Sequence, residues 1–336
     1  MINVGIIGLG RAGRFHLRSI KAIDHFSLKY IVDPGLTAND PIFNGLDVEL
    51  LSGTEKVLND AFIDAVIISS PTQFHFQAIF DALNAGKHVF TEKPLGKTTE
   101  EIKRCYEAAR NNNRALHLGF QRRHDQNFIE LKRSISEIGS PRIIKTSSRD
   151  NPQPSIEYLK TSGNIFHDML IHDFDMLLYL LGLKIPQSIY ATGHAYDSNI
   201  EILNDFDTVM VHLQYEDGLI VTIDTSRTAP YGYDQRIEIF SEDGMAIAEN
   251  QRNHTVEIHN ESGRHHPPIN YSFPQRYYNA YKNEMIAFAN GILNDDLFTV
   301  TYEDCLMAHL MADMAYESAV SGEVIHIDRE MLDFSI

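Results

Sequence analysis

Apolar segments alternate with amphipathic stretches along the first 120 residues. Short, nearly continuous apolar runs occupy positions 2–7, 28–33, 65–70, 88–92 and 114–119. Runs of this kind are typical of strands that are buried on both faces of a parallel sheet. Stretches with helical periodicity separate them, so the pattern predicts an α/β fold with a doubly wound parallel sheet. Prolines and glycines interrupt positions 35–53, where we expect irregular structure.

The character of the chain changes after residue 120. Apolar and polar residues alternate in several strand-like segments, at about 142–149, 187–196, 206–215, 219–226, 235–241 and 244–249. This alternation predicts an α+β domain with a large, mostly antiparallel sheet that is open to solvent or a partner on one face. Helical patterns are expected at about 125–138, 276–293 and 302–320. We therefore predict two domains, residues 1–120 and 121–336.

The stretch 163–182 has the strongest helical pattern in the second half. Its apolar residues recur every three or four positions up to Gly182, which is expected to end the helix. On the remaining face Asp168 and His172 are one turn apart, and Asp175 and Tyr179 continue the polar stripe. An imidazole beside a carboxylate suits general acid–base catalysis. The alternative is a core helix with a solvated polar stripe.

The sequence does not predict a metal site. His167 is five positions from His172 on another helical face, and no His-Glu-x-x-His spacing occurs in this stretch. The run from His265 to Pro268 is expected to be a mobile loop without a metal role. Cys105 and Cys305 are the only cysteines, and we interpret both as structural thiols.

A glycine motif follows the first predicted strand. Gly8 permits a tight turn, Gly10 lets the backbone approach a pyrophosphate, and Gly13 allows a helix to pack closely on the strand. The second strand ends at Asp33, 20 positions after Gly13, where a carboxylate would bind ribose hydroxyls and repel a 2′-phosphate. This favours NAD over NADP, although Asp33 could be only a turn residue before Pro34. The expected cofactor-binding residues are Gly8, Gly10, Arg11, Ala12, Gly13, Asp33, Ser70, Thr72, His75, Glu92 and Lys93.

Glu92-Lys93-Pro94 stands at the carboxyl end of a predicted parallel strand, which is the edge where ligands bind in open α/β sheets. The proline fixes the backbone, through a cis bond in one interpretation, and Lys93 could hold a proton near a substrate hydroxyl. The alternative is an ordinary surface turn. Thr72 and His75 follow another strand at the same edge, where His75 could instead be a helix N-terminal residue without a role.

Composition limits the class of protein and its partners. The chain has 336 residues, 43% of them apolar and 22% charged, as in ordinary globular proteins. Its formal net charge of −17 argues against binding nucleic acid or anionic membranes, because both require a basic surface. No signal-like segment or bilayer-length apolar run occurs. We expect a cytoplasmic protein.

The order of Gly8-x-Gly10-x-x-Gly13, Glu92-Lys93-Pro94 and Asp168-x-x-x-His172 resembles that of the Gfo/Idh/MocA family of nicotinamide-dependent sugar and polyol dehydrogenases. Within the family the chain is most similar to inositol 2-dehydrogenases, over the stretches 119–128, 148–152, 163–175 and 231–236. The resemblance implies an N-terminal Rossmann domain, a C-terminal domain carrying the substrate site, and a homo-oligomer, a tetramer or a dimer.

The resemblance also implies the activity and the site. We expect NAD-dependent oxidation of a cyclic polyol, myo-inositol to 2-keto-myo-inositol, without a metal. Catalysis is expected of Lys93, Asp168 and His172, and substrate binding of these three with Arg123, Asp150, Asn151 and Tyr231. His124 stands where relatives more often have phenylalanine, so another inositol isomer or an aldose is the alternative substrate. The other alternative is a non-catalytic nucleotide-binding sensor.

Overall fold

The computed structural model describes residues 1–336 except 38, 295–297, 330–331, 333 and 336. The chain divides into two compact units. Unit 1 consists chiefly of Met1–His124 and Asn279–Leu306, and unit 2 of Asp125–Tyr278 and the chain that follows Leu306. The polypeptide therefore returns to unit 1 after it has built most of unit 2.

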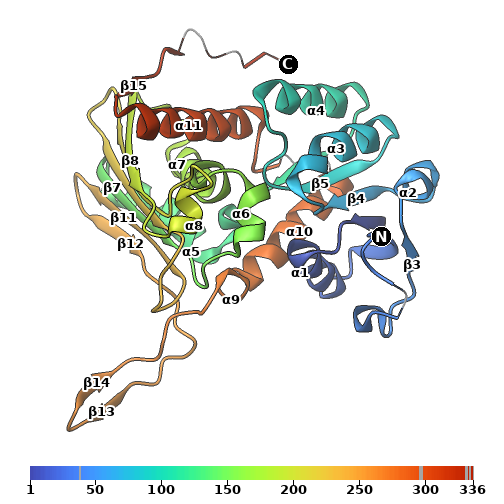
Figure 1. The fold of residues 1–336 in the computed structure, drawn as a ribbon, viewed down its shortest axis with the longest axis horizontal. Helices are drawn as coiled ribbons and strands as arrows, with labels where there is room; N and C mark the ends of the chain where they lie inside the picture. The colour runs from blue at the N-terminus through green and yellow to red at the C-terminus, as the bar shows by residue number, and fades with distance from the viewer. Residues whose placement is uncertain (38, 295–297, 330–331, 333, 336) are drawn as a thin grey trace. The chain divides into compact units, whose positions relative to one another are not determined.

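Unit 1 contains a six-stranded parallel sheet (Figure 1). Its order is β3-β2-β1-β4-β5-β6, so the chain runs outward from β1 in both directions, which confirms the doubly wound sheet. The strands are β1 Ile2–Ile7, β2 Phe26–Val32, β3 Glu49–Leu51, β4 Ala65–Ile68, β5 His88–Glu92 and β6 Leu116–Gly119. The main helices are α1 Arg11–Lys21, α2 Glu55–Asn59, α3 His75–Asn84, α4 Thr99–Asn111 and α10 Tyr278–Asn294.

The expectation of irregular structure throughout 35–53 was wrong at its end. Strand β3 pairs with β2 in parallel, with Tyr30 opposite Glu49. A three-residue edge strand is too short to show a periodicity of its own, so only its partner strand defines it. A short 3-10 turn at Pro41–Phe43 precedes it.

Helix α10 belongs to the core of unit 1. Its residues Met285, Phe288 and Ala289 are fully buried and join the apolar cluster that contains Ile6 and Phe90 of the sheet. A parallel sheet must bury both of its faces. Helix α10 helps to cover the unit 1 sheet although it is distant from the strands in the sequence. The two predicted domains, residues 1–120 and 121–336, divide the chain only once and therefore leave α10 outside the first domain.

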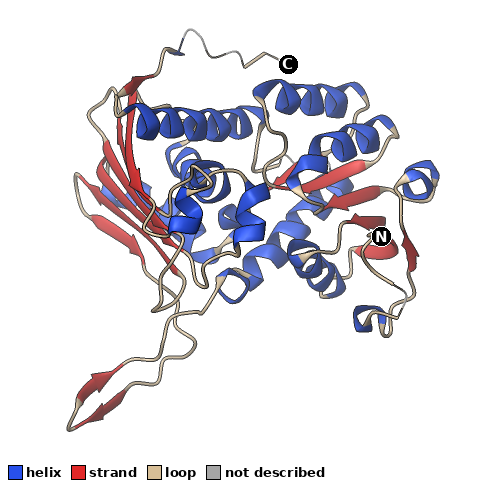
Figure 2. Ribbon diagram, viewed as in Figure 1, coloured by secondary structure: helices blue, strands red, loops and turns tan. Residues whose placement is uncertain are grey.

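Unit 2 is built on a seven-stranded sheet with helices on one face (Figure 2). Its order is β12-β11-β7-β10-β9-β8-β15, and β7 with β10 is the one parallel pair, which confirms a mostly antiparallel sheet. The strands are β7 Pro141–Arg149, β8 Ser188–His194, β9 Thr208–Gln214, β10 Ile220–Ser226, β11 Asp234–Ser241, β12 Met245–Ala248 and β15 Ile325–His326. The longer helices are α5 Gln126–Ile138, α7 Ile171–Leu181 and α11 Tyr302–Ser321.

The segment expected to be a loop at His265 is partly a hairpin. Strands β13 Ile258–Asn260 and β14 Gly263–His265 pair antiparallel, and His266 Nδ1 is 2.9 Å from Glu257 Oε1. All strand residues of this hairpin are exposed, and apart from Ile258 they are polar or glycine, so it lacks the apolar alternation by which strands are recognised. Unit 2 also has three short helices, α6 Ile156–Ser162, α8 Ser198–Glu201 and α9 Phe273–Arg276. Within the described residues, no helix is both long enough and apolar enough to cross a membrane.

Candidate functional site

The glycine turn of unit 1 is shaped to receive a dinucleotide phosphate. Gly8 has φ +88°, and a Cβ there would lie 2.5 Å from the Ser70 nitrogen. A Cβ on Gly13 would lie 2.2 Å from the Gly8 oxygen, so both positions require glycine. At Gly10 a Cβ would meet no atom within 4 Å, which leaves open space at the N-terminus of α1. The amides of a helix N-terminus favour an anion, so the turn fits the pyrophosphate of NAD.

Asp33 is fixed beside this turn. Its Oδ2 accepts a hydrogen bond from the Leu9 amide at 2.8 Å, and its Oδ1 accepts one from the Gly35 amide at 2.9 Å. The carboxylate therefore stands next to the glycine loop at the end of β2, where an adenosine ribose is bound in this type of sheet. The preference for NAD over its 2′-phosphorylated form, predicted from Asp33, stays a prediction.

His75 joins two loops at the carboxyl edge of the sheet. Its ring is buried, with Nδ1 2.7 Å from the Pro94 carbonyl oxygen and Nε2 2.7 Å from the Ser70 carbonyl oxygen. Each ring nitrogen therefore faces a backbone carbonyl oxygen, one in each loop. His75 thereby holds the Lys93–Pro94 segment against the end of β4. Thr72 lies in a 3-10 turn just before it and is half-buried.

Lys93 is half-buried at the end of β5, and the Lys93–Pro94 bond is cis, as one interpretation of the sequence expected. The preceding Glu92 has its Oε1 2.6 Å from Nε2 of the buried His16. Burial by itself would raise the pKa of Glu92, but the hydrogen bond from His16 and the nearby charges of His16, Lys93 and His75 lower that pKa below its usual value. A carboxylate therefore stands beside the lysine.

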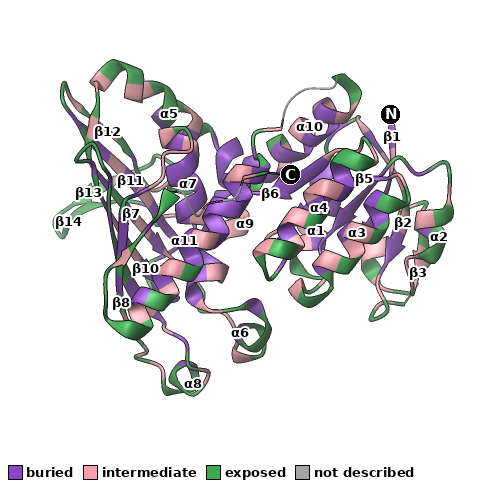
Figure 3. Cartoon of the chain, turned by 90° about the horizontal axis from the view of Figure 1, so that it is seen from above, coloured by how far each residue is buried: buried purple, intermediate pink, exposed green. Residues whose placement is uncertain are grey.

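In unit 2 the predicted helix begins with a π-helical turn, Phe166–Leu170, and continues as α7 to Gly182, which has the expected left-handed conformation with φ +68°. Figure 3 shows α7 almost wholly buried. Asp168 in the π turn is 7% exposed and Asp175 in α7 is 1% exposed. The polar stripe is therefore not a solvated one, and its carboxylates need partners inside the protein.

Asp168 has two such partners, one 10 and the other 59 residues away in the sequence. Its Oδ2 accepts a hydrogen bond from Arg227 Nη1 at 3.0 Å, and its Oδ1 accepts one from the Tyr158 hydroxyl at 2.7 Å. Arg227 is fully buried and also donates to Asp205 at 2.8 Å. Burial lowers the pKa of Arg227, but the two carboxylates raise it more, so the guanidinium remains charged. Sequence reasoning missed Arg227 and Tyr158, because no local pattern links them to Asp168. His172, half-buried, is the second residue of α7.

Several predicted substrate residues gather at one end of the unit 2 sheet. The register pairs Arg149 at the end of β7 with Asp234 of β11 and with Ser226 of β10. Asp150 and Asn151 follow β7, and Arg227, the partner of Asp168, follows β10.

Tyr231 contacts residues at the same end of the sheet. Its hydroxyl accepts a hydrogen bond from Arg149 Nη1 at 2.8 Å and donates one to Asp234 Oδ2 at 2.6 Å. It lines a hollow of about 610 Å³ together with Asp234 and Arg236. Asn151 donates to the Tyr271 carbonyl oxygen at 2.8 Å.

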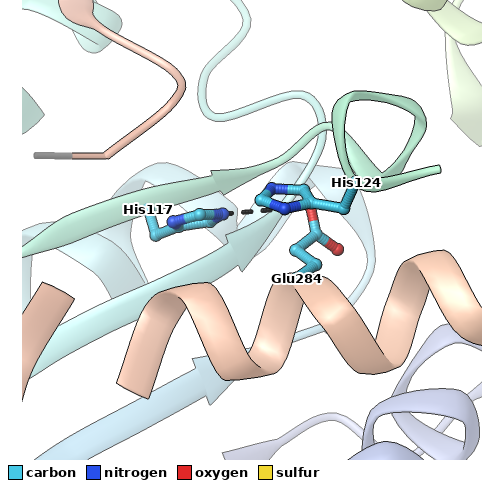
Figure 4. Close-up of side chains that lie close together, drawn as sticks. All are labelled: His117, His124 and Glu284. Carbon is cyan, nitrogen blue, oxygen red and sulfur yellow. Dashed lines mark ion pairs between the residues drawn. The ribbon is translucent and has the colours of Figure 1, made fainter. Parts of the chain in front are cut away.

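Arg123, which the resemblance predicts to bind substrate, has contacts within unit 1. The side chain is buried in unit 1, where its guanidinium contacts the Thr299 carbonyl oxygen and pairs with Asp304 at 3.0 Å. The adjacent His124 is also buried, close to His117 and Glu284 (Figure 4). These contacts place Arg123 in the interior of unit 1, and its role in substrate binding stays a prediction.

Sequence and structure comparisons identify relatives of the whole chain. The profile of an oxidoreductase family with an NAD-binding Rossmann fold matches residues 2–120, and that of the Gfo/Idh/MocA C-terminal domain matches residues 128–247. The oxidoreductase YrbE of Bacillus subtilis, itself uncharacterized, is 37% identical, with 97% of each chain covered. Myo-inositol 2-dehydrogenase of Thermotoga maritima is 36% identical, covering 94% of this chain and 96% of that protein. The crystal structure of Lactobacillus casei scyllo-inositol dehydrogenase with NAD(H) and scyllo-inositol has a TM-score of 0.89 at 32% identity, with 97% and 99% covered.

Proposed function

The chain belongs to the Gfo/Idh/MocA family of NAD-dependent oxidoreductases, and we propose that it oxidises myo-inositol at C2 to 2-keto-myo-inositol. The relatives named for inositol oxidation match it over nearly its full length. A second inositol isomer is the main alternative, because one solved relative holds scyllo-inositol. Polyol catabolism in the cytoplasm is the role that fits this activity.

The proposed reaction divides the work among three side chains. His172 takes the proton of the reacting hydroxyl, and Asp168 orients the ring and stabilises its charged form. Lys93 donates a hydrogen bond to the reacting oxygen and stabilises the developing alkoxide. NAD supplies the hydride acceptor. No metal ion is needed in this reaction.

The observation that carries the proposal is the state of Asp168. The Asp168 carboxyl group is buried and is fixed in position by a buried guanidinium and a tyrosine hydroxyl. A fixed negative charge next to a histidine-bearing helix is what an imidazole base requires. A nucleotide-binding sensor that catalyses no reaction does not need Asp168 and His172 together with Lys93 at the carboxyl end of β5.

The direct test is a substrate panel. We expect the purified protein to reduce NAD with myo-inositol, measured by absorbance of the reduced cofactor, and to prefer it to scyllo-inositol, other isomers and aldoses by kcat/KM. His172→Gln should abolish turnover and retain NAD binding. Activity confined to an aldose would overturn the substrate, and NAD binding without turnover of any polyol would indicate the sensor.

Oligomer formation is proposed for the bare face of the unit 2 sheet. Exposed apolar side chains occur there on neighbouring strands, at Tyr190, Met210, Ile220, Phe240 and Ile247. Such a patch marks a protein interface, and a dimer or a tetramer would cover it. Met210→Lys with Phe240→Lys should give a smaller species by sedimentation velocity, whereas Ile258→Lys on the exposed hairpin should not. An unchanged mass in the double variant would place the interface elsewhere.

A further inference from the structure

Three potential metal ligands meet in unit 2 outside the residues assigned to the reaction. His309 and Asp313 are four residues apart on α11 and therefore lie on one face of that helix. His167, in the π-helical turn, places its Nε2 2.9 Å from Asp313 Oδ1, and His309 Nε2 is 3.5 Å from Asp313 Oδ2. The three ligand atoms all lie within 4.8 Å of one another.

The hydrogen bonds of His167 define which nitrogen faces the carboxylate. Asn164 Oδ1 accepts from the backbone amides of Phe166 and His167, both at 3.1 Å, so the orientation of its side-chain amide is fixed. The same oxygen is 2.9 Å from His167 Nδ1, which must therefore donate. In a neutral ring, Nε2 then presents its lone pair to the Asp313 carboxylate. An imidazole nitrogen and a carboxylate oxygen that face each other in this way are atoms that a divalent metal ion binds.

We propose that His167, His309 and Asp313 form a binding site for a divalent transition metal of the zinc class. Zinc binds imidazole nitrogen and carboxylate oxygen at about 2.0–2.2 Å in a tetrahedral arrangement, so its ligand atoms are about 3.3 Å apart. The two histidines face different oxygens of Asp313, and the separations of 2.9 Å to Oδ1 and 3.5 Å to Oδ2 lie on either side of that value. Three protein ligands leave a fourth position for water.

The surroundings fit such an ion. When a histidine binds a metal through one ring nitrogen, a hydrogen bond from the other nitrogen fixes the tautomer. In His167, Nδ1 makes this hydrogen bond with Asn164 Oδ1. Asp313 is 51% exposed, which gives an ion access from solvent, whereas His309 is 5% exposed and fixes the inner side.

The cluster of His117, His124 and Glu284 in unit 1 has the same residue types but carries no such inference (Figure 4). All three side chains are buried, and His117 Nε2 is 3.9 Å from Glu284 Oε1. The charge of Arg123 lowers the pKa of both histidines, in addition to burial. A guanidinium that disfavours a proton there disfavours a divalent cation more strongly.

An ion at the proposed site would join the π-helical turn to α11. The turn also carries Asp168, so occupancy would restrict the segment that holds this carboxylate. Binding itself follows from the geometry and does not depend on the proposed reaction. A loss of polyol oxidation without a loss of metal would concern the reaction alone.

The test uses the untagged full-length chain, stripped with a chelator and dialysed against Zn²⁺. We expect one zinc per chain by elemental analysis, a raised Tm, and the d–d absorption of tetrahedral Co²⁺ when cobalt is substituted. Asp313→Asn and His309→Gln should each abolish stoichiometric uptake and the cobalt spectrum. Asn164→Ala should weaken affinity by about 10–100-fold, as expected for an outer partner.

The hairpin of unit 2 supplies the matched control. Glu257 also stands between two histidines, at 3.3 Å from His259 and 2.9 Å from His266, but it pairs with Arg264 on the exposed surface. Glu257→Gln should leave zinc uptake unchanged. Circular dichroism establishes that each variant is folded. Equal uptake by wild type and both ligand variants, or no uptake by folded wild type, would overturn the site.

Discussion

The glycine turn of unit 1 and the π-helical turn of unit 2 position their functional groups by opposite means. In unit 1 the turn is made from backbone amides and from Asp33, which bonds the Leu9 amide within the same β-α-β segment. In unit 2 Asp168 is positioned by Arg227, 59 residues away, and His167 contacts Asp313, 146 residues away.

This difference has a physical consequence. A site made from backbone close in sequence can change its side chains with little effect on folding, because few buried charges depend on them. A site made from buried ion pairs couples function to stability, since removing one partner leaves the other charge buried and unpaired. The predictions below separate the two kinds of site.

The largest effect is expected at Arg227. Arg227→Met removes the shared partner of two buried carboxylates, Asp168 and Asp205, and should lower the free energy of unfolding by about 3–5 kcal/mol in urea titrations. Lys145→Met is the control, because Lys145 pairs with Glu238 at the surface, with 59% and 31% exposed, and should cost at most about 1 kcal/mol. Equal losses in the two variants would remove the distinction.

Lys93→Ala tests the local site of unit 1. We expect kcat to fall about 100-fold or more, which corresponds to about 2.7 kcal/mol, because one stabiliser of the alkoxide is lost. NAD should still bind, as measured by calorimetry, and the unfolding free energy should remain close to wild type. Lys97→Ala, on the exposed side of the same loop, is the matched control. Normal turnover by Lys93→Ala would reduce Glu92-Lys93-Pro94 to a structural turn.

Unit 1 also contains the buried cluster of His117, His124 and Glu284, and we expect His124 to make the stability of the fold depend on pH. Burial, with the charge of Arg123, lowers the pKa of His124 from 6.5 to about 4. The unfolded chain therefore binds more protons between about pH 4 and 6.5, so stability falls as pH decreases through this window and levels off above it. The slope is up to about 1.4 kcal/mol per pH unit for one histidine.

His124→Phe should reduce this slope, measured as the free energy of unfolding at several pH values. His212→Phe, at an exposed position on β9, should leave it unchanged. A slope that is the same in wild type and His124→Phe would show that His124 is protonated as readily in the folded chain as in the unfolded one.

The smallest effect is expected at Asp33. Asp33→Asn keeps an acceptor for the Leu9 amide and removes the charge, and Asp33→Ser removes both the charge and the longer side chain. Loss of one repulsive charge is worth about 1 kcal/mol near water, so the ratio of kcat/KM for NAD to that for NADP should drop several-fold, up to about tenfold. Asp47→Ser, exposed in the same unit, should not change it. An unchanged ratio in both Asp33 variants would assign the preference to another residue.

The sequence alone determined the features that depend on chain neighbours. The apolar periodicity predicted both sheets, the glycine spacing predicted the turn before α1, and Gly182 predicted the end of α7. Each of these follows from backbone conformation or from a repeat within a few turns, so no distant residue was needed. The inferred family and cofactor rested on the same local motifs.

Only the tertiary structure decided which distant side chains meet. Arg227 reaches Asp168, Arg123 is used inside unit 1, and α10 returns to complete the first core. From its own helix, His167 offered no metal site, because its partners His309 and Asp313 lie on α11, more than 140 positions further along the chain. Contacts of this kind are set by the packing of whole elements, and that packing also fixes the burial and neighbouring charges on which each ionisation depends.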